Sequence, residues 1–453
     1  MLLLVKILLG LAGLGVVVFV HELGHFIAAR LMGIDVEAFS IGWGKPLIKK
    51  KIGDVEYRLG MFPLGGYCKM KGENEFQEAW ENRQNAAPRT PGTFLGTSPL
   101  KRIVVSFMGP FFNLVFAVLT FSVIWGIGFE VNTLENRIVL LSDISPGSIN
   151  PADEAGMKTG DRILEIHGRK TENYHDIQAG IAVSPDENLP IKIERDGQIL
   201  NLTIRPSLEK STGAGRIGVY NWTSPIVAKA AEGSPAEAAG LKSGDKILRI
   251  NGEEFRYTVA LIPILEKQPQ ALKLDIERSG RIIETELVLS YTENGPEDPG
   301  IAWETISYRT PRLNPFAALA KGMSETWRTF TVSLRSLALL FKGIDLTQAV
   351  SGPVRITYMV GDVAAEGFGQ SFGAGISSMA NFLALISIAL CIMNLLPLPI
   401  LDGGMILLFA VEAIRRKPLH PRAVYVFQTI GVALIFGLMI FAVVGDILFL
   451  SRR

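Results

Sequence analysis

Four long stretches of this chain carry almost no charge, and they limit its fold more than any other feature. Three contain no Asp, Glu, Lys or Arg, and the N-terminal one contains only three such residues; they are residues 103–129, 367–401, 423–445 and 1–32. About 20 consecutive apolar residues suffice to cross a bilayer as a helix. Charged residues make up 20% of the chain, and nearly all of them lie outside these stretches. The sequence therefore predicts four transmembrane helices and a large water-soluble part.

Lys and Arg residues near the ends of the spans predict the orientation of the chain. They concentrate in two loops, residues 33–101 and 398–422, which are expected to stay in the cytoplasm. Residues 127–375 and both termini are then exported. The net charge of +1 excludes the basic field of a nucleic-acid binder. The two cysteines, Cys68 and Cys391, lie outside the exported part, so a disulfide framework there is excluded.

The exported region contains an internal duplication. Residues 155–168 match residues 239–252 at nine of fourteen positions, and a second match joins residues 193–197 to residues 276–280. Each copy predicts a short helix that ends at Gly, a turn, a strand and a His-Gly or Asn-Gly hairpin. The shared Gly-Asp-x-Ile-Leu-x-Ile-x-Gly string resembles PDZ domains of the bacterial, circularly permuted type, which bind extended peptides by strand addition.

PDZ domains often bind a peptide carboxylate through backbone N–H groups in a tight loop, which glycine permits. By this resemblance, Ile217, Gly218 and Val219 are expected to form that loop in the second copy. In the first copy Val139 stands where the glycine is needed. Both copies could equally be spacers or size filters that bind no peptide.

His21, Glu22 and His25 carry the clearest chemical signal. Residues four apart on a helix lie on one face, so His21 and His25 can bind one Zn²⁺ with Glu22 beside it as general base. Ionisable residues inside a span are costly and usually functional. Zinc hydrolases typically add a third protein ligand and a water. Asp402 follows the third span, and the predicted topology places it at the depth of His21, near the cytoplasmic face.

The segment from Asn394 to Asp402 reads Asn-x-x-Pro-x-Pro-x-x-Asp and ends in Gly403-Gly404, which are expected to let the backbone turn. Together with the His-Glu-x-x-His helix, the four spans and the two PDZ-like copies, it resembles the site-2 protease family of intramembrane zinc metalloproteases. The resemblance covers essentially the whole chain. It implies these roles: zinc ligands His21, His25 and Asp402, catalytic base Glu22, and substrate-positioning residues Asn394, Pro397 and Pro399.

The resemblance further implies an endopeptidase of the bacterial inner membrane that cleaves single-span proteins in the envelope stress response. A monomer is the expected oligomeric state. Its expected substrates are an anti-sigma factor already shortened outside the membrane and remnant signal peptides. The PDZ pair would exclude intact substrates by size. Alternation within residues 52–71 predicts a hairpin with its turn at residues 60–66; the resemblance implies that it presents the substrate as an added strand, and a plain cytoplasmic hairpin is the alternative. The alternatives are a membrane-anchored zinc protease that cuts soluble loops and an inactive PDZ membrane scaffold.

The expected fold class is an α-helical polytopic membrane protein with a membrane-associated β-hairpin or sheet and two tandem circularly permuted PDZ domains. Residues 315–342 are expected to form an interfacial amphipathic helix. The predicted segments are 1–32 (first span), 33–101 (cytoplasmic β-region), 102–126 (second span), 127–208 and 209–309 (PDZ domains), 310–375 (helical linker), 376–397 (third span), 398–422 (cytoplasmic loop) and 423–450 (fourth span).

Overall fold

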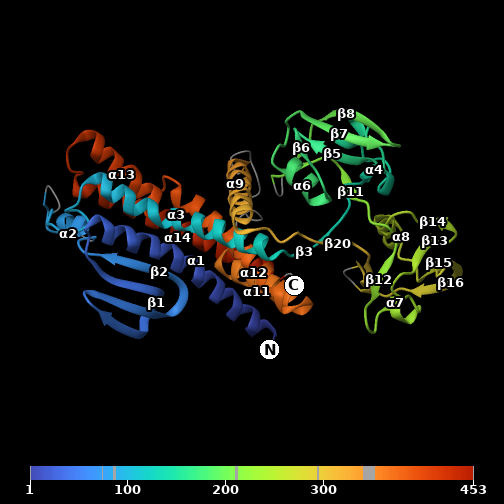
Figure 1. Ribbon diagram of the computed structural model, residues 1–453, viewed down its shortest axis with the longest axis horizontal. Helices are drawn as coiled ribbons and strands as arrows, with labels where there is room; N and C mark the ends of the chain where they lie inside the picture. Colours follow the sequence, from blue (N-terminus) through green and yellow to red (C-terminus); the bar gives the residue numbers. More distant parts are fainter. Residues whose placement is uncertain are drawn as a thin grey trace. The chain divides into compact units, whose positions relative to one another are not determined.

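The computed structural model describes residues 2–73, 75–84, 88–209, 213–292, 295–339 and 352–451. Two compact units are distinguished within it (Figure 1). The first, here called the helical unit, holds the described residues of 1–129, 310–337 and 346–453; the second, the repeat unit, holds those of 130–309 and 338–345. Each unit is described by itself.

Four helices of the helical unit are long and apolar enough to cross a membrane. They are α1 (Leu2–Met32), α3 (Pro99–Ile127), α12 (Phe372–Leu395) and α14 (Pro421–Ser451). A helix pairs its backbone N–H and C=O groups internally, which lipid requires of a spanning segment. In Figure 1, α3 runs alongside α1, and both α1 and α12 pack against it. The prediction of a polytopic membrane protein with four spans is confirmed.

Glycines allow these helices to approach one another closely. A Cβ on Gly24 of α1 would lie only 2.3 Å from the carbonyl oxygen of Met108 in α3. A Cβ on Gly10 would lie 2.2 Å from the carbonyl oxygen of Thr357 in α11 (Pro353–Gln370). Small residues at crossings let helix backbones pack tightly in a membrane. The position of α1 is therefore fixed by close contact with both α3 and α11.

The helix expected over residues 315–342 is present as α9 (Pro315–Leu339), and residues 340–342 lie outside the described residues. Gly322 packs α9 against α3, since a Cβ there would lie 2.2 Å from the Ser122 hydroxyl. Several large apolar side chains of α9 remain exposed: Phe316, Leu319, Met323, Trp327 and Leu334. Such a stripe is typical of a helix at a membrane interface, which stays a prediction.

A sheet follows α1 and is built from two long bent strands, β1 (Val36–Ile52) and β2 (Val55–Met70). Because of the bends, the two strands supply four segments. In sheet order these segments are residues 66–69, 38–41, 56–59 and 48–52. Residues 66–70 therefore form one edge of the sheet and residues 48–52 the other.

The pairing expected within residues 52–71 is wrong. The strand turn falls at Gly53, which has a φ of +61°, and not at residues 60–66. The two halves of β2 do not pair with each other, because residues 38–41 lie between them. Gly42 and Gly60 cross so closely that a Cβ on Gly60 would lie 2.5 Å from the Gly42 carbonyl carbon. This crossing bends both strands and sets the observed order.

Two shorter helices, α2 (Glu75–Glu81) and α13 (Asp402–Arg415), complete the helical unit. Glu412 of α13 is 2% exposed and Arg102 of α3 is 1% exposed, and their charged groups meet at 2.8 Å. The Arg102 guanidinium also lies 4.6 Å from the centre of the Phe409 ring. Arg89 contacts the same carboxylate. This buried cluster holds α13, which begins at Asp402, against α3.

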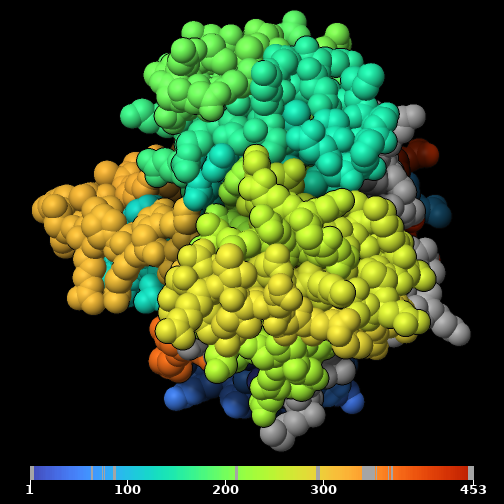
Figure 2. Space-filling model, turned by 90° about the vertical axis from the view of Figure 1, so that its right-hand side faces the viewer, coloured from blue at the N-terminus to red at the C-terminus, as the bar shows by residue number. Residues whose placement is uncertain are grey.

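The repeat unit contains two copies of one arrangement, as the duplication predicted. Their four-stranded sheets have the same order, β6-β5-β7-β8 and β14-β13-β15-β16. Figure 2 shows the surface of the first copy in green and that of the second in yellow. The first copy contains β4 (Ile138–Leu140), α4 (Leu141–Ile144), α5 (Pro151–Glu154), β5 (Arg162–Ile166), β6 (Arg169–Lys170), α6 (Tyr174–Ala182), β7 (Leu189–Arg195), β8 (Gln198–Ile204), β9 (Ser207–Leu208), β10 (Gly215–Arg216) and β11 (Val219–Asn221).

The second copy repeats these elements with small differences in its turns. It contains β12 (Val227–Ala230), α7 (Pro235–Ala238), β13 (Lys246–Ile250), β14 (Glu253–Glu254), η1 (Thr258–Ala260), α8 (Leu261–Glu266), β15 (Ala271–Arg278), β16 (Arg281–Val288), β17 (Tyr291–Thr292), β18 (Gly295–Pro296) and β19 (Ile301–Trp303). The chain enters and leaves the unit through an antiparallel ribbon formed by β3 (Glu130–Thr133) and β20 (Ile306–Arg309).

An ion pair explains why two separate strings recur in both copies. Arg195 donates two hydrogen bonds of 2.7 Å to the buried carboxylate of Asp161. Arg278 makes the same two bonds to Asp245. Each Arg also donates to a carbonyl at the end of the short helix of its copy. The Gly-Asp string and the Ile-Glu-Arg string are therefore the two halves of one buried contact.

Candidate metal centre

The structure brings His21, His25 and Asp402 together, although Asp402 lies more than 370 positions from the histidines. The two Nε2 atoms are 3.2 Å apart. Asp402 places Oδ2 3.3 Å from His21 Nε2 and Oδ1 3.4 Å from His25 Nε2. Within the described residues, this trio is the only group of His, Cys, Asp or Glu side chains placed to share a metal ion.

These distances fit a zinc ion. Ligand atoms about 2.0–2.1 Å from a tetrahedral zinc lie roughly 3.3 Å from one another, close to the three observed separations. The two imidazole nitrogens and the carboxylate, which places one oxygen near each imidazole, are thus spaced as three ligand groups of one tetrahedral zinc would be. The donor set of two imidazoles and a carboxylate is one that zinc hydrolases use. The side chains of His21 and Asp402 are 11% and 20% exposed, so the trio is mostly buried but not fully enclosed.

The other ring nitrogens of both histidines are held by α3. His25 Nδ1–H donates to the Val105 carbonyl at 2.9 Å. His21 Nδ1 lies 3.2 Å from the side-chain amide of Asn113. The Asn113 oxygen is fully buried and accepts no hydrogen bond from the described residues. Exchanging the amide oxygen and nitrogen, which have the same shape, lets His21 Nδ1–H donate to Oδ1. Both Nε2 atoms are then left as metal ligands.

Asn113 and Gly109 are site residues that the sequence interpretation missed. A Cβ on Gly109 would lie 2.3 Å from His25 Nε2 and 2.9 Å from His21 Cε1. Glycine is therefore required for α3 to pass the two imidazoles. The one available signal was Asn113 itself, a fully polar side chain within a charge-free span, since polar groups in a membrane are usually functional.

Glu22 lies between α1 and the sheet. A Cβ on Gly66 of β2 would lie 3.2 Å from Glu22 Cγ, and the Cys68 backbone N–H donates to the Glu22 carboxylate. Burial and the nearby Glu22 and Glu73 carboxyls raise the pKa of the Cys68 thiol, which is not among the side chains placed to share the metal. The general base predicted from the sequence thus lies beside residues 66–70, one edge of the sheet.

The turn that presents Asp402 is conformationally strained. Ile400 has a φ of +77°, which is rare and costly for a β-branched residue. Gly403 and Gly404 were expected to let the backbone turn, but both are helical and lie in α13. Their role is close packing, since a Cβ on either would lie 2.1–2.3 Å from carbonyl oxygens of the preceding segment. The glycines allow the first turn of α13 to pack closely against the end of α12.

In the segment from Asn394 to Asp402, Asn394 lies close to the metal trio. Asn394 of α12 has its amide nitrogen 3.5 Å from His21 Nε2. Pro399 packs against Gly431 of α14, whose added Cβ would lie 2.3 Å from it, and Pro397 is exposed in the same turn. The substrate-positioning role of these residues stays a prediction.

Ile217, Gly218 and Val219 belong to the first copy of the repeat, which corrects their assignment to the second. Ile217 is part of the first copy's core, and Val219 pairs with Leu140. Gly218 has a φ of +74° and would place a Cβ 2.3 Å from Asn150. In the second copy Gly300 takes the equivalent position. This strand comes last in each copy and not first.

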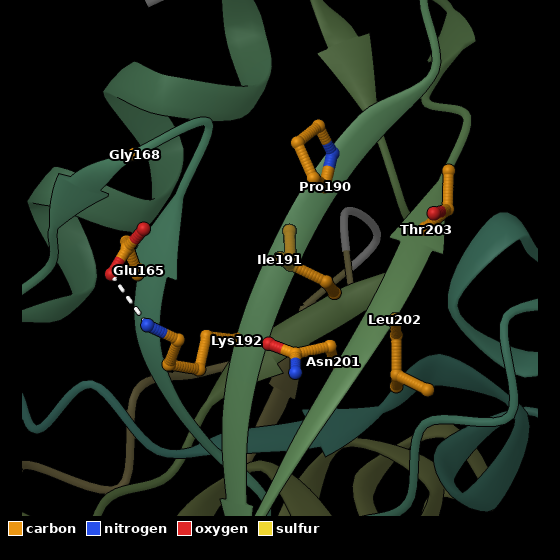
Figure 3. A pocket seen from close by; sticks show the side chains of 8 residues that line it. All are labelled: Glu165, Gly168, Pro190, Ile191, Lys192, Asn201, Leu202 and Thr203. Atoms are coloured by element: carbon orange, nitrogen blue, oxygen red, sulfur yellow. Dashed lines mark hydrogen bonds and ion pairs between the residues drawn. The ribbon is translucent and has the colours of Figure 1, made fainter.

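A hollow of about 210 Å³ lies over strands β5, β7 and β8 of the first copy (Figure 3). Its charged side chains, Glu165 and Lys192, pair with each other at 3.0 Å. Both are satisfied by this ion pair, and nothing in the hollow resembles the trio in the helical unit.

Comparison with known proteins agrees with this chemistry. The model of Peptidase family M50 matches residues 9–438. The chain is 40% identical to a putative zinc metalloprotease of Treponema pallidum, over 99% of this chain and 100% of the relative. It is 32% identical to a regulator of sigma E protease of Haemophilus influenzae and 30% identical to Protease RseP of Yersinia pestis, over 96% of this chain and 97% of each relative. The resemblance drawn from the sequence is thereby confirmed, and the chain belongs to Peptidase family M50, the site-2 proteases, as a multi-pass membrane zinc metalloprotease.

Proposed function

We propose that this chain cleaves peptide bonds within the membrane, with His21, His25 and Asp402 as zinc ligands and Glu22 as general base. The supporting observation is that three potential ligand side chains, two of them from a membrane-spanning helix, lie at zinc-ligand spacing. A protease that cut only soluble loops would not need its ligands on such a helix. An inactive scaffold would not need the complete set of ligands and base.

The chain's own groups account for the proton transfers. Zinc held by the trio would polarise the scissile carbonyl and make a water molecule more acidic. The Glu22 carboxylate accepts a proton from that water as its oxygen attacks the carbonyl carbon. The same carboxyl group then gives the proton to the amide nitrogen as the C–N bond breaks. One water is consumed, and a new carboxylate and a new amine are formed.

The sheet is the proposed substrate guide. A helix in lipid hides its carbonyls in its own hydrogen bonds, so a spanning substrate must unwind before cleavage. Residues 66–70 form an edge of the sheet beside Glu22, and an edge strand can pair with an extended peptide. Asn394, Pro397 and Pro399 would position the unwound segment from the other side of the trio.

The two copies in residues 130–309 are proposed to be circularly permuted PDZ domains that act as a size filter. The last strand of each copy, which follows Gly218 in the first copy and Gly300 in the second, supports the circularly permuted type. They and both termini are proposed to be periplasmic, with the metal centre near the cytoplasmic face of the bacterial inner membrane. Two relatives are named Regulator of sigma E protease, which favours an anti-sigma factor as substrate. We propose that it is cleaved after shortening outside the membrane and that remnant signal peptides are a second substrate class.

The test uses the purified full chain in detergent with a model single-span substrate and a soluble unfolded protein. We expect about one zinc per chain and cleavage of the single-span substrate within its apolar segment. Glu22→Gln should keep its zinc and lose cleavage, whereas Asp402→Ala should lose zinc. Cleavage by Glu22→Gln, or cleavage of the soluble protein alone, would contradict the proposal.

A further inference from the structure

The outer edge of the sheet, residues 43–54, is here called the basic edge. Each of its twelve residues is exposed. Side chains alternate between the two faces of a strand, so neither face of this edge is covered by the rest of the helical unit. A strand exposed on both faces is expected to be polar, and this one is not.

The basic edge combines large apolar side chains with unpaired cations. Its most exposed apolar side chains are Trp43, Leu47, Ile48 and Ile52, which are 57–65% exposed. Its cations are Lys45, Lys49, Lys50 and Lys51, and Asp54 is its one acidic residue. Among the described residues, none forms an ion pair with these lysines. By contrast, Lys69 of β2 and Lys71, just after that strand, do have carboxylate partners.

This combination matches the boundary between lipid and water. Apolar side chains and Trp favour the interfacial layer, where an apolar body can be buried while polar groups stay wet. Lysine carries its ammonium on a long apolar stem, so it can reach phosphates at that level. A zwitterionic headgroup offers no net charge to four cations, but an anionic headgroup does.

We propose that the basic edge is a binding surface for anionic phospholipid headgroups, which hold the sheet against the bilayer. Lys49, Lys50 and Lys51 contact the headgroup phosphates, while the apolar side chains around them enter the acyl boundary. The surface lies at the opposite edge of the sheet from residues 66–70, so headgroup binding leaves the edge beside Glu22 free.

The test is native mass spectrometry of the full chain in neutral detergent, with phosphatidylglycerol or phosphatidylethanolamine added. The wild type is expected to bind more phosphatidylglycerol at low ionic strength. The triple variant Lys49→Gln, Lys50→Gln, Lys51→Gln should lose roughly fivefold in affinity for each lysine removed. The triple Lys→Arg variant at the same positions should retain the preference, because it keeps the charges.

A matched control replaces three exposed lysines of the repeat unit by glutamine: Lys229, Lys246 and Lys273. It changes net charge equally and should bind phosphatidylglycerol as the wild type does. Zinc content reports whether each variant folds, and high salt, which screens exposed charges, should remove the preference from the wild type without any mutation. Unchanged phosphatidylglycerol binding by the triple Gln variant, or equal loss in the control, overturns the proposal. An acidic peptide added in place of the lipid is a further probe. If the triple Gln variant loses affinity for that peptide but keeps its affinity for phosphatidylglycerol, the basic edge is a protein contact and the proposal is overturned.

Discussion

Gly109 and His25 come from different spans, yet a single methyl group on Gly109 would lie 2.3 Å from His25 Nε2. The metal trio therefore depends on the absence of a side chain at position 109 of α3 as much as on its own three side chains. A Cβ contact below 3.0 Å cannot be tolerated without movement, and the atom it meets is the ligand nitrogen. The distance between α1 and α3 at their crossing thus sets the geometry of the metal centre, and neither can change without the other.

Gly109→Ala should abolish zinc binding. The new methyl group must displace the imidazoles or push α3 away from α1, and either change disrupts the spacing of the three proposed ligand side chains. The measurement is zinc content of the purified protein, which should fall from about one per chain to near zero. Gly126→Ala is the control on the same helix, because its Cβ would lie 3.7 Å from the nearest atom, an ordinary contact. Full zinc occupancy in Gly109→Ala would refute this reading of the site.

Asn113→Leu should weaken zinc binding without removing a ligand. The substitution leaves His21 Nδ1–H without an acceptor, and loss of such a supporting hydrogen bond typically costs 10–100-fold in metal affinity. Competition with a chelator of known affinity measures the change. Asn113→Asp, which keeps an acceptor oxygen, should restore most of the affinity; equal weakening by both substitutions would indicate a packing role only.

Local patterns were enough to predict the spans and the first two candidate ligands, His21 and His25. Charge-free runs define spans through composition alone, and His21 and His25 share a face through helix periodicity. Asp402 followed from topology, because parallel spans bring their ends to one depth. Asn113 and Gly109 could not be assigned in this way, because their roles arise only where two helices cross. The sheet order and the copy that contains Gly218 likewise depend on long-range pairing and on bends, which local alternation does not encode.

Arg102→Met should destabilise the helical unit by about 3 kcal/mol, because it leaves the buried Glu412 carboxylate with Arg89 as its remaining partner. The midpoint of thermal unfolding in detergent should fall, and zinc should be lost at a lower temperature, since Glu412 holds the helix that begins at Asp402. Arg415→Met removes an exposed charge from the same helix and should change stability by no more than about 0.5 kcal/mol. Equal effects of the two substitutions would show that the buried pair does not anchor α13.

Arg278→Met should loosen the second copy of the repeat and leave the first intact. Asp245 would remain buried without the two hydrogen bonds from Arg278, so the strands of the second copy should open more often and exchange faster. Hydrogen–deuterium exchange resolves the two copies, with β13 and β15 as reporters and the equivalent β5 and β7 as internal controls. Faster exchange in all four strands would mean that the copies unfold as one unit.

The same ion pair makes the second copy sensitive to acid in a defined direction. Burial alone would raise the pKa of Asp245, but the hydrogen bonds from Arg278 and the Lys242 N–H outweigh it and lower that pKa below the ordinary value. A carboxyl whose pKa is lowered by folding stabilises the fold above its unfolded pKa of about 3.9, and that contribution is lost as the pH falls through the folded value. The difference in unfolding midpoint between wild type and Asp245→Asn should therefore be constant from about pH 7 to pH 5 and shrink below about pH 4. A difference that grows in acid would mean that the protonated form of Asp245 is the one the fold prefers.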